Sequence, residues 1–160
     1  LSSTVYSRDY LNTSSNTAFF VAGDATHGYE LWKSDGSVSG TKMVKDINPG
    51  TNNSAPKGMF IYKKEVYFAA DDVAGPSFWK SDGTKAGTIQ LRQIDPWYGS
   101  TVFSNNKYDF CISNDILYFA AINYNKAKGK QIWRTDGKKE GTNVVKEISR
   151  NANRYKPEHN

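Results

Sequence analysis

Cysteine is almost missing from this chain, and histidine is scarce. Cys111 is the one cysteine among 160 residues, so no disulfide within the chain can hold the fold together. It stands between Phe110 and Ile112, and we expect it to be a small, buried, apolar side chain. The two histidines, His27 and His159, cannot complete a closed zinc site with that one cysteine, because such a site needs four nitrogen or sulfur ligands.

Long apolar runs are missing as well. No stretch approaches the ~20 apolar residues of a membrane-spanning helix, so the sequence predicts no membrane span. The net charge is +5, but the basic residues are spread along the chain and are not interleaved with aromatics as in nucleic-acid-binding proteins. We therefore expect a solvated surface and no nucleic-acid partner.

One motif is present three times. Each copy contains Trp, a basic residue, Ser/Thr-Asp-Gly, a second glycine four residues on and then Thr. The three copies read ELWKSDGSVSGTKMVKDIN (30–48), SFWKSDGTKAGTIQLRQID (77–95) and QIWRTDGKKEGTNVVKEIS (131–149). A fixed internal period indicates a repeat architecture. The repeated positions are Trp32, Asp35, Gly36, Gly40, Trp79, Asp82, Gly83, Gly87, Trp133, Asp136, Gly137 and Gly141.

The second copy predicts four short strands joined by hairpin-length turns. They are expected at 57–63, 66–70, 77–81 and 88–94. Residues 66–70 form a continuous apolar run, although a strand with one wet face would alternate apolar and polar residues. Both faces should therefore be covered, and stacked sheets arranged radially, as the blades of a β-propeller, provide that burial.

The spacing of the tryptophans places the units. Trp32 and Trp79 are 47 residues apart, a normal blade length, and the extra residues before Trp133 fall in connections. We expect an all-β fold of three blades, each a four-stranded antiparallel meander. The predicted ranges are blade one at 1–48, blade two at 49–95, blade three at 96–149, and a linker with the start of a further blade at 150–160. Three blades are too few for a ring, so we expect part of a larger propeller or, alternatively, a ring closed between two chains.

The Ser/Thr-Asp-Gly triplet has a sufficient structural explanation. The aspartate can accept a hydrogen bond from the backbone N–H two residues on, which makes an Asx-turn. The first glycine would supply a positive φ, and the second glycine would do the same where the chain enters the last strand. The tryptophans are expected to fill the space between blades, with each indole N–H satisfied locally.

The motif resembles the ELWxxDGT repeat family. The match is closest at Glu30–Gly36, looser at 78–83 and 132–137, and covers essentially the whole chain. The resemblance implies tandem units in secreted or cell-surface proteins with no established common chemistry. The glutamate of the first copy is replaced by Ser77 and Gln131, so no shared function can rest on it. The motif is also similar to the Asp-box of sialidases, which is mainly structural there.

These features favour a non-enzymatic extracellular protein that acts in assembly or adhesion. Its partners would be other protein chains or further blades of the same protein. A glycosidase-like propeller is less favoured, because no pair of carboxylates is singled out, and no catalytic or cofactor residue is assigned. Calcium is the main chemical alternative, although the EF-hand pattern is missing. Its candidate oxygen ligands would be Asp24, Asp35, Asp46, Asp71, Asp72, Asp82 and Asp136.

Carbohydrate binding is the alternative function. Trp97 and Tyr98 form an aromatic pair in an inter-unit loop, where they could stack on a sugar ring. Asn12 and Asn52 each begin an N-glycosylation sequon, which is compatible with a secreted glycoprotein. The sequence thus leaves glycans open both as a ligand and as a modification.

Overall fold

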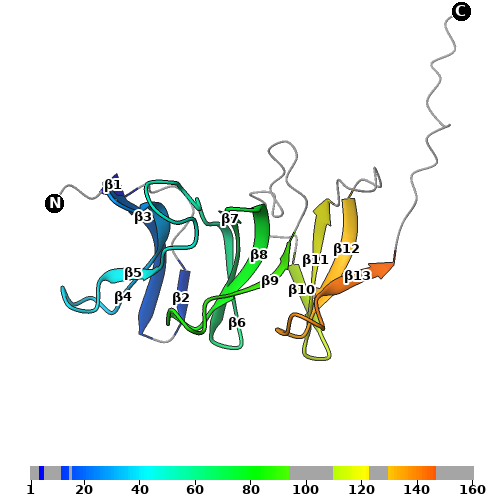
Figure 1. Ribbon diagram of the computed structural model, residues 1–160. Coiled ribbons are helices and arrows are strands. Elements are labelled where there is room, and N and C mark those ends of the chain that lie inside the picture. Colours follow the sequence, from blue (N-terminus) through cyan, green and yellow to red (C-terminus); the bar gives the residue numbers. More distant parts are fainter. Residues whose placement is uncertain (1–3, 6–11, 15, 94–109, 123–129, 147–160) are drawn as a thin grey trace, which may run out of the picture.

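The protein is all-β in the part of the chain that the structure describes. The computed structural model describes residues 4–5, 12–14, 16–93, 110–122 and 130–146 (Figure 1). These residues form three antiparallel sheets that follow one another along the chain. They contain no helix, and therefore none that could cross a membrane. None of the three sheets closes on itself.

The first sheet has the strand order β1-β3-β4-β5, and β2 also pairs with β3. Both β1 and β2 pair with β3, but at different points along it: β1 pairs near Ala22 and β2 near Phe19. The strands are β1 (Thr4–Val5), β2 (Asn12–Ser14), β3 (Thr17–Asp24), β4 (Gly28–Ser34) and β5 (Lys42–Lys45).

The second and third sheets are four-stranded antiparallel meanders, as the sequence predicted. Their orders are β6-β7-β8-β9 and β10-β11-β12-β13. The second sheet consists of β6 (Lys57–Tyr62), β7 (Glu65–Asp72), β8 (Gly75–Ser81) and β9 (Ile89–Gln93). The third consists of β10 (Phe110–Ser113), β11 (Ile116–Ile122), β12 (Lys130–Thr135) and β13 (Asn143–Lys146).

The repeat extends to a bulge beside each tryptophan. The pairing of the last two strands shifts register immediately before Trp32, Trp79 and Trp133. In the second sheet, Phe78 pairs with Arg92 and Trp79 with Gln90, which leaves Leu91 as the extra residue. A bulge re-aims side chains and increases the local twist of the strand pair.

The middle sheet is covered on both faces. Alternate residues of β7 enter different clusters: Val66 and Phe68 pack with the first sheet, whereas Tyr67 and Ala69 pack with the third. Both clusters contain residues that are almost completely buried. The non-alternating apolar run therefore did predict burial on both sides, since each parity of the strand meets a different neighbour.

Two hairpin turns carry a positive φ at both central residues. Lys63 and Lys64 have φ values of 50° and 65°, and Asn114 and Asp115 have 49° and 59°. Two such residues in succession make the type I′ turn, whose twist matches that of the flanking strands. The connection between the strands predicted at 66–70 and 77–81 is shorter than expected, because β7 continues to Asp72 and β8 begins at Gly75.

Cys111 was predicted to be buried, and that prediction is wrong. It lies on β10 with an exposed side chain and pairs with Tyr118 of β11. β10 is an edge strand of the third sheet, and the face that it shares with Tyr118 points away from the second sheet. The apolar neighbours of Cys111 in the sequence could not reveal that its side chain would lie on the face of the sheet that points away from the second sheet.

Candidate functional site

The repeated aspartate is the acceptor of a tight turn in every unit. Its Oδ1 accepts a hydrogen bond from the backbone N–H two residues on, which is the Asx-turn that the sequence predicted. The pairs are Asp35 with Ser37 at 2.9 Å, Asp82 with Thr84 at 2.8 Å and Asp136 with Lys138 at 2.8 Å.

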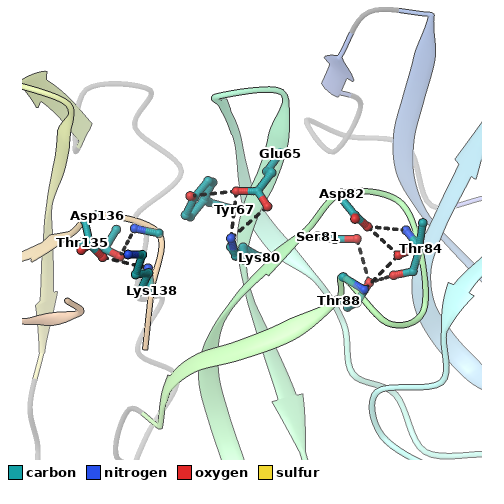
Figure 2. Close-up of polar contacts among 12 residues, drawn as sticks. Glu65, Tyr67, Lys80, Ser81, Asp82, Thr84, Thr88, Thr135, Asp136 and Lys138 are labelled. Carbon is teal, nitrogen blue, oxygen red and sulfur yellow. Dashed lines mark hydrogen bonds and ion pairs between the residues drawn. The ribbon is translucent and has the colours of Figure 1, made fainter. Parts of the chain in front are cut away.

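A chain of hydroxyls supports each turn, and the sequence prediction missed it. In the second sheet the Gly83 N–H donates to Ser81 Oγ, and Thr88 Oγ1 donates to the Thr84 carbonyl. Because Thr88 uses its own proton there, the Ser81 hydroxyl donates to Thr88 Oγ1, 2.7 Å away (Figure 2). The equivalent hydroxyl pairs are Ser34–Thr41 and Thr135–Thr142, also at 2.7 Å.

The first two units add a further hydroxyl to the aspartate. Ser37 and Thr84 each donate their side-chain proton to the aspartate Oδ1, and each accepts the N–H of the second glycine. These side-chain hydrogen bonds, together with those from the backbone, lower the pKa of Asp35 and Asp82 from the ordinary value of 3.8. The third unit has Lys138 at this position, so the turn forms without the extra hydroxyl.

The two glycines of the motif serve different purposes. Gly36, Gly83 and Gly137 have φ values of 91°, 88° and 90°, as predicted for the first glycine. The second glycines, Gly40, Gly87 and Gly141, do not have a positive φ, so that prediction is wrong. These positions have no room for a side chain, because a Cβ at each of them would overlap the carboxylate of Asp35, Asp82 or Asp136.

Trp79 and Trp133 fill the space between sheets, but the indole N–H groups of all three motif tryptophans are unpaired among the described residues. Trp79 and Trp133 are 6% and 4% exposed, in agreement with the predicted packing role. The indole N–H of Trp32, Trp79 and Trp133 is buried with no hydrogen-bond partner among the described residues. The expected local partner is therefore missing, and burial of apolar ring surface must outweigh the cost of each unpaired donor.

Glu30 is a second polar centre that occurs only in the first unit. Its fully buried carboxylate accepts backbone N–H groups of Ile47, Asn48 and Ser54, and the hydroxyl of Ser54 at 2.6 Å. Burial raises the pKa of Glu30, and the four donated bonds oppose that rise. The carboxylate thereby fixes the segment that leads from the first sheet to the second.

Asp24 and His27 form a compact polar turn between β3 and β4. The His27 ring nitrogen lies 3.0 Å from both carboxylate oxygens, and the Thr26 hydroxyl donates to Oδ1 at 2.7 Å. The bond from His27 lowers the pKa of Asp24, and the same bond raises the pKa of His27. In the second unit Val73 and Ala74 connect the equivalent strands, and Asp72 accepts the Ala74 N–H there without a histidine or a threonine beside it.

The structure describes only part of the predicted ligand and modification sites. Trp97 and Tyr98 lie outside the described residues. Asn12 is in β2, and Asn52 is exposed in the segment between the first and second sheets, where its side chain donates to the Pro49 carbonyl. The hydroxyl residue of the second sequon, Ser54, is buried against Glu30.

The candidate calcium ligands are divided among separate turns. Asp46 accepts the Gly50 N–H and Asp72 accepts the Ala74 N–H, so each carboxylate is engaged locally. Within the described ranges, no group of three or more His, Cys, Asp or Glu side chains is arranged to hold a metal ion. Burial raises the pKa of Asp71, whose Oδ1 has no hydrogen-bond partner there.

The comparisons with known proteins add no relative whose site could be transferred to this one. No protein-family model matches the chain, and no curated protein is significantly similar to it.

Proposed function

We propose that this chain is a non-enzymatic repeat protein whose three sheets are blades of a β-propeller, and that it acts in assembly or adhesion. The support for blades is the sequential antiparallel order of the strands together with sheets that stack face to face. A stack of this kind is a rigid body that presents its edges and end faces to partners. Those partners would be further blades or other protein chains.

One observation carries this proposal. The polar groups that the three units share bond to their own turn: the aspartate to a backbone N–H, and the paired hydroxyls to each other and to a carbonyl. A repeated ligand site would instead leave such groups free to point outward. The motif therefore works as a structural device that ends one strand and begins the next.

We also propose that the protein is extracellular. This rests on the resemblance of the motif and on the two sequons, of which Asn52 is exposed. The carbohydrate-binding alternative rests on Trp97 and Tyr98, and the described residues add no observation in its favour.

The test compares the intact chain with Asp82→Ala and Trp97→Ala. Each protein is measured for thermal unfolding, for binding to a glycan array and for hydrolysis of a panel of fluorogenic glycosides. We expect Asp82→Ala to lower the unfolding midpoint, and we expect no array signal or turnover from the intact chain. Array binding lost in Trp97→Ala, or turnover lost in a folded Asp82→Ala protein, would overturn the proposal.

A further inference from the structure

Each sheet has a forward face, turned toward the next unit in the chain, and a rear face, turned toward the preceding one. In the second sheet, Phe68 and Trp79 lie on the rear face against the first sheet, and Tyr67, Phe78 and Leu91 lie on the forward face against the third. The motif and the strand pairing beside it align every one of these positions between units, since Phe20, Phe68 and Phe119 each pair with the tryptophan of their own unit. The chain therefore contains the same interface twice, from the first sheet to the second and from the second to the third.

The forward face of the third sheet has the same character but has nothing packed on it among the described residues. Leu31 and Phe78 are completely buried, whereas the equivalent Ile132 is 44% exposed. At the bulge the exposed fractions are 6% for Val44, 0% for Leu91 and 49% for Val145. The exposed apolar side chains at this end are thus those that the other two units bury against a neighbour.

The rear face of the first sheet is the complementary half. Phe68 and Phe119 are 0% and 3% exposed, but the equivalent Phe20 is only half-buried. Trp32 is likewise half-buried, whereas Trp79 and Trp133 are buried. The two ends of the stack are therefore the two sides of one interface.

The aspartate turn also belongs to this interface. The Gly83 turn lies on the first unit, where a Cβ would be 3.3 Å from the Phe19 ring and 3.5 Å from Lys33. The Gly137 turn lies on the second unit, where a Cβ would be 2.8 Å from the Tyr67 hydroxyl. Figure 2 shows Tyr67 between the third unit's turn and the Glu65–Lys80 ion pair, in which Lys80 Nζ lies 2.9 Å from Glu65 Oε1.

At the ends of the stack these turn contacts are open. A Cβ on Gly36 would meet no atom within 4 Å among the described residues. In the other units the residues equivalent to Tyr118 and Arg134 lie against the aspartate turn of the next unit. In the third unit Tyr118 is half-buried and Arg134 is exposed. Arg134 is equivalent to Lys33 and Lys80 of the other two units, so all three units have a basic residue at this position.

A cation–π contact crosses each internal interface. Lys45 lies over the Trp79 ring, 5.3 Å from its centroid, and Arg92 lies over the Trp133 ring at 5.8 Å. Both cations come thirteen residues after the tryptophan of their own unit. The third unit has Lys146 at that position, where it is exposed. A tryptophan held between sheets is stabilised by a cation over its face, because the face of the ring carries partial negative charge.

We propose that a second copy of this chain docks head to tail on the first. The rear face of its first sheet would cover the forward face of the third sheet, with Trp32 of one copy under Lys146 of the other and the Gly36 turn on Tyr118 and Arg134. The proposal deepens the assembly role proposed above and rests on it. The partner is fixed by the repeat, because the chain itself carries both halves of the interface.

The first experiment is sedimentation equilibrium of the full chain over a range of concentrations. We expect a mass above the 17.9 kDa of one chain, increasing with concentration. Lys146→Glu should weaken association about tenfold, since it removes the cation and opposes the aromatic face. Lys138→Glu changes the charge equally at an exposed turn residue and should leave association unchanged.

A mixing experiment tests the direction of docking. Lys146→Glu blocks the forward face. Met43→Lys places a charge on the rear face, at the position where Val144 of the third unit packs against the apolar cluster that it shares with the second sheet. Each variant alone should be impaired in association, while an equimolar mixture should recover heterodimers through the one interface in which both faces are native. Circular dichroism melts of both variants confirm that each one folds.

Three outcomes would overturn the head-to-tail assignment. One is a monomer at ~100 µM, where an interface with a Kd of about 1 µM would be mostly assembled. Another is equal association of Lys146→Glu and Lys138→Glu, and a third is a mixture that associates no better than its components. Each leaves the structural role of the motif intact, since that role is tested separately by Asp82→Ala and the glycan and glycoside panels. The readout can be supported by Cys111, whose exposed thiol should react more slowly with a maleimide in the assembled state.

Discussion

At the scale of the residue, the aspartate turn shows how one side chain determines its neighbours. The Asp82 carboxylate lies over the chain where β9 begins, and it occupies the space in which a side chain at position 87 would start. Thr84 then donates to the same oxygen through both its backbone and its hydroxyl. The second glycine of the motif is thus a consequence of the aspartate and not of the backbone conformation.

Gly87→Ala should therefore be costly only while Asp82 is present. We expect the substitution to destabilise the protein by about 1–3 kcal/mol, because the new methyl group overlaps the carboxylate. In an Asp82→Ala background the same change should cost much less. A double-mutant cycle from urea unfolding measures this coupling. Strict additivity would contradict the steric explanation and would return the position to a backbone origin.

The stability of the protein should fall when Glu30 loses its charge but keeps its shape. Glu30→Gln replaces one acceptor oxygen with an N–H₂ group that faces donors, so we expect destabilisation of about 1–3 kcal/mol. Ser54→Ala removes a single hydroxyl donor and should cost less. Chemical denaturation of the three proteins gives the comparison. A glutamine variant as stable as the parent would show that the carboxylate does not hold the connecting segment.

At the scale of the element, the periodic features were predictable and the singular ones were not. The strands of the second sheet, the two-sided burial of β7 and the Asx-turns follow from a pattern that the chain states three times. Glu30 and the exposed thiol of Cys111 each occur once, so no period marks their role. The paired hydroxyls are periodic, but serine and threonine are common in turns, and only the geometry shows that they bond to each other.

The turns also predict how stability depends on pH. The folded pKa values of Asp35 and Asp82 lie below their ordinary value of 3.8, so the unfolded chain binds protons more readily. Their contribution is fully present well above pH 3.8 and is lost as the pH falls through the folded values. Unfolding at several pH values should show this decline, and Asp82→Asn should make it shallower. An unchanged pH profile in that variant would contradict the assignment.

The type I′ turn at Lys63 and Lys64 offers a stabilising change. Both residues have a positive φ, a conformation that costs side-chain-bearing residues about 1 kcal/mol or more each. Replacing the pair with Asn-Gly should raise the free energy of unfolding by about 1 kcal/mol, even after loss of the partly exposed Lys63–Asp115 pair. Asp115→Gly in the equivalent turn is the parallel test. A loss of stability in both would argue against the I′ assignment.

At the scale of the whole molecule, the stack is built of units that depend on one another. A single four-stranded sheet has two apolar faces here and cannot bury either face alone, so each sheet stabilises its neighbour. The middle sheet has a partner on both sides, while the outer sheets each have one within the described chain. The middle sheet should therefore be more stable than the outer sheets as long as no second copy covers the open faces.

Equivalent aromatics should accordingly differ in what they contribute. Phe68→Ala removes a completely buried ring and should cost about 3–5 kcal/mol, whereas Phe20→Ala removes its half-buried equivalent and should cost clearly less. The comparison belongs at dilute protein concentration, where the chain is a monomer. At high concentration Phe20 would be covered by a second copy, and the cost of its removal should rise. Equal costs at all concentrations would mean that position in the stack does not govern stability, because the two residues share the same strand position and differ only in their neighbours.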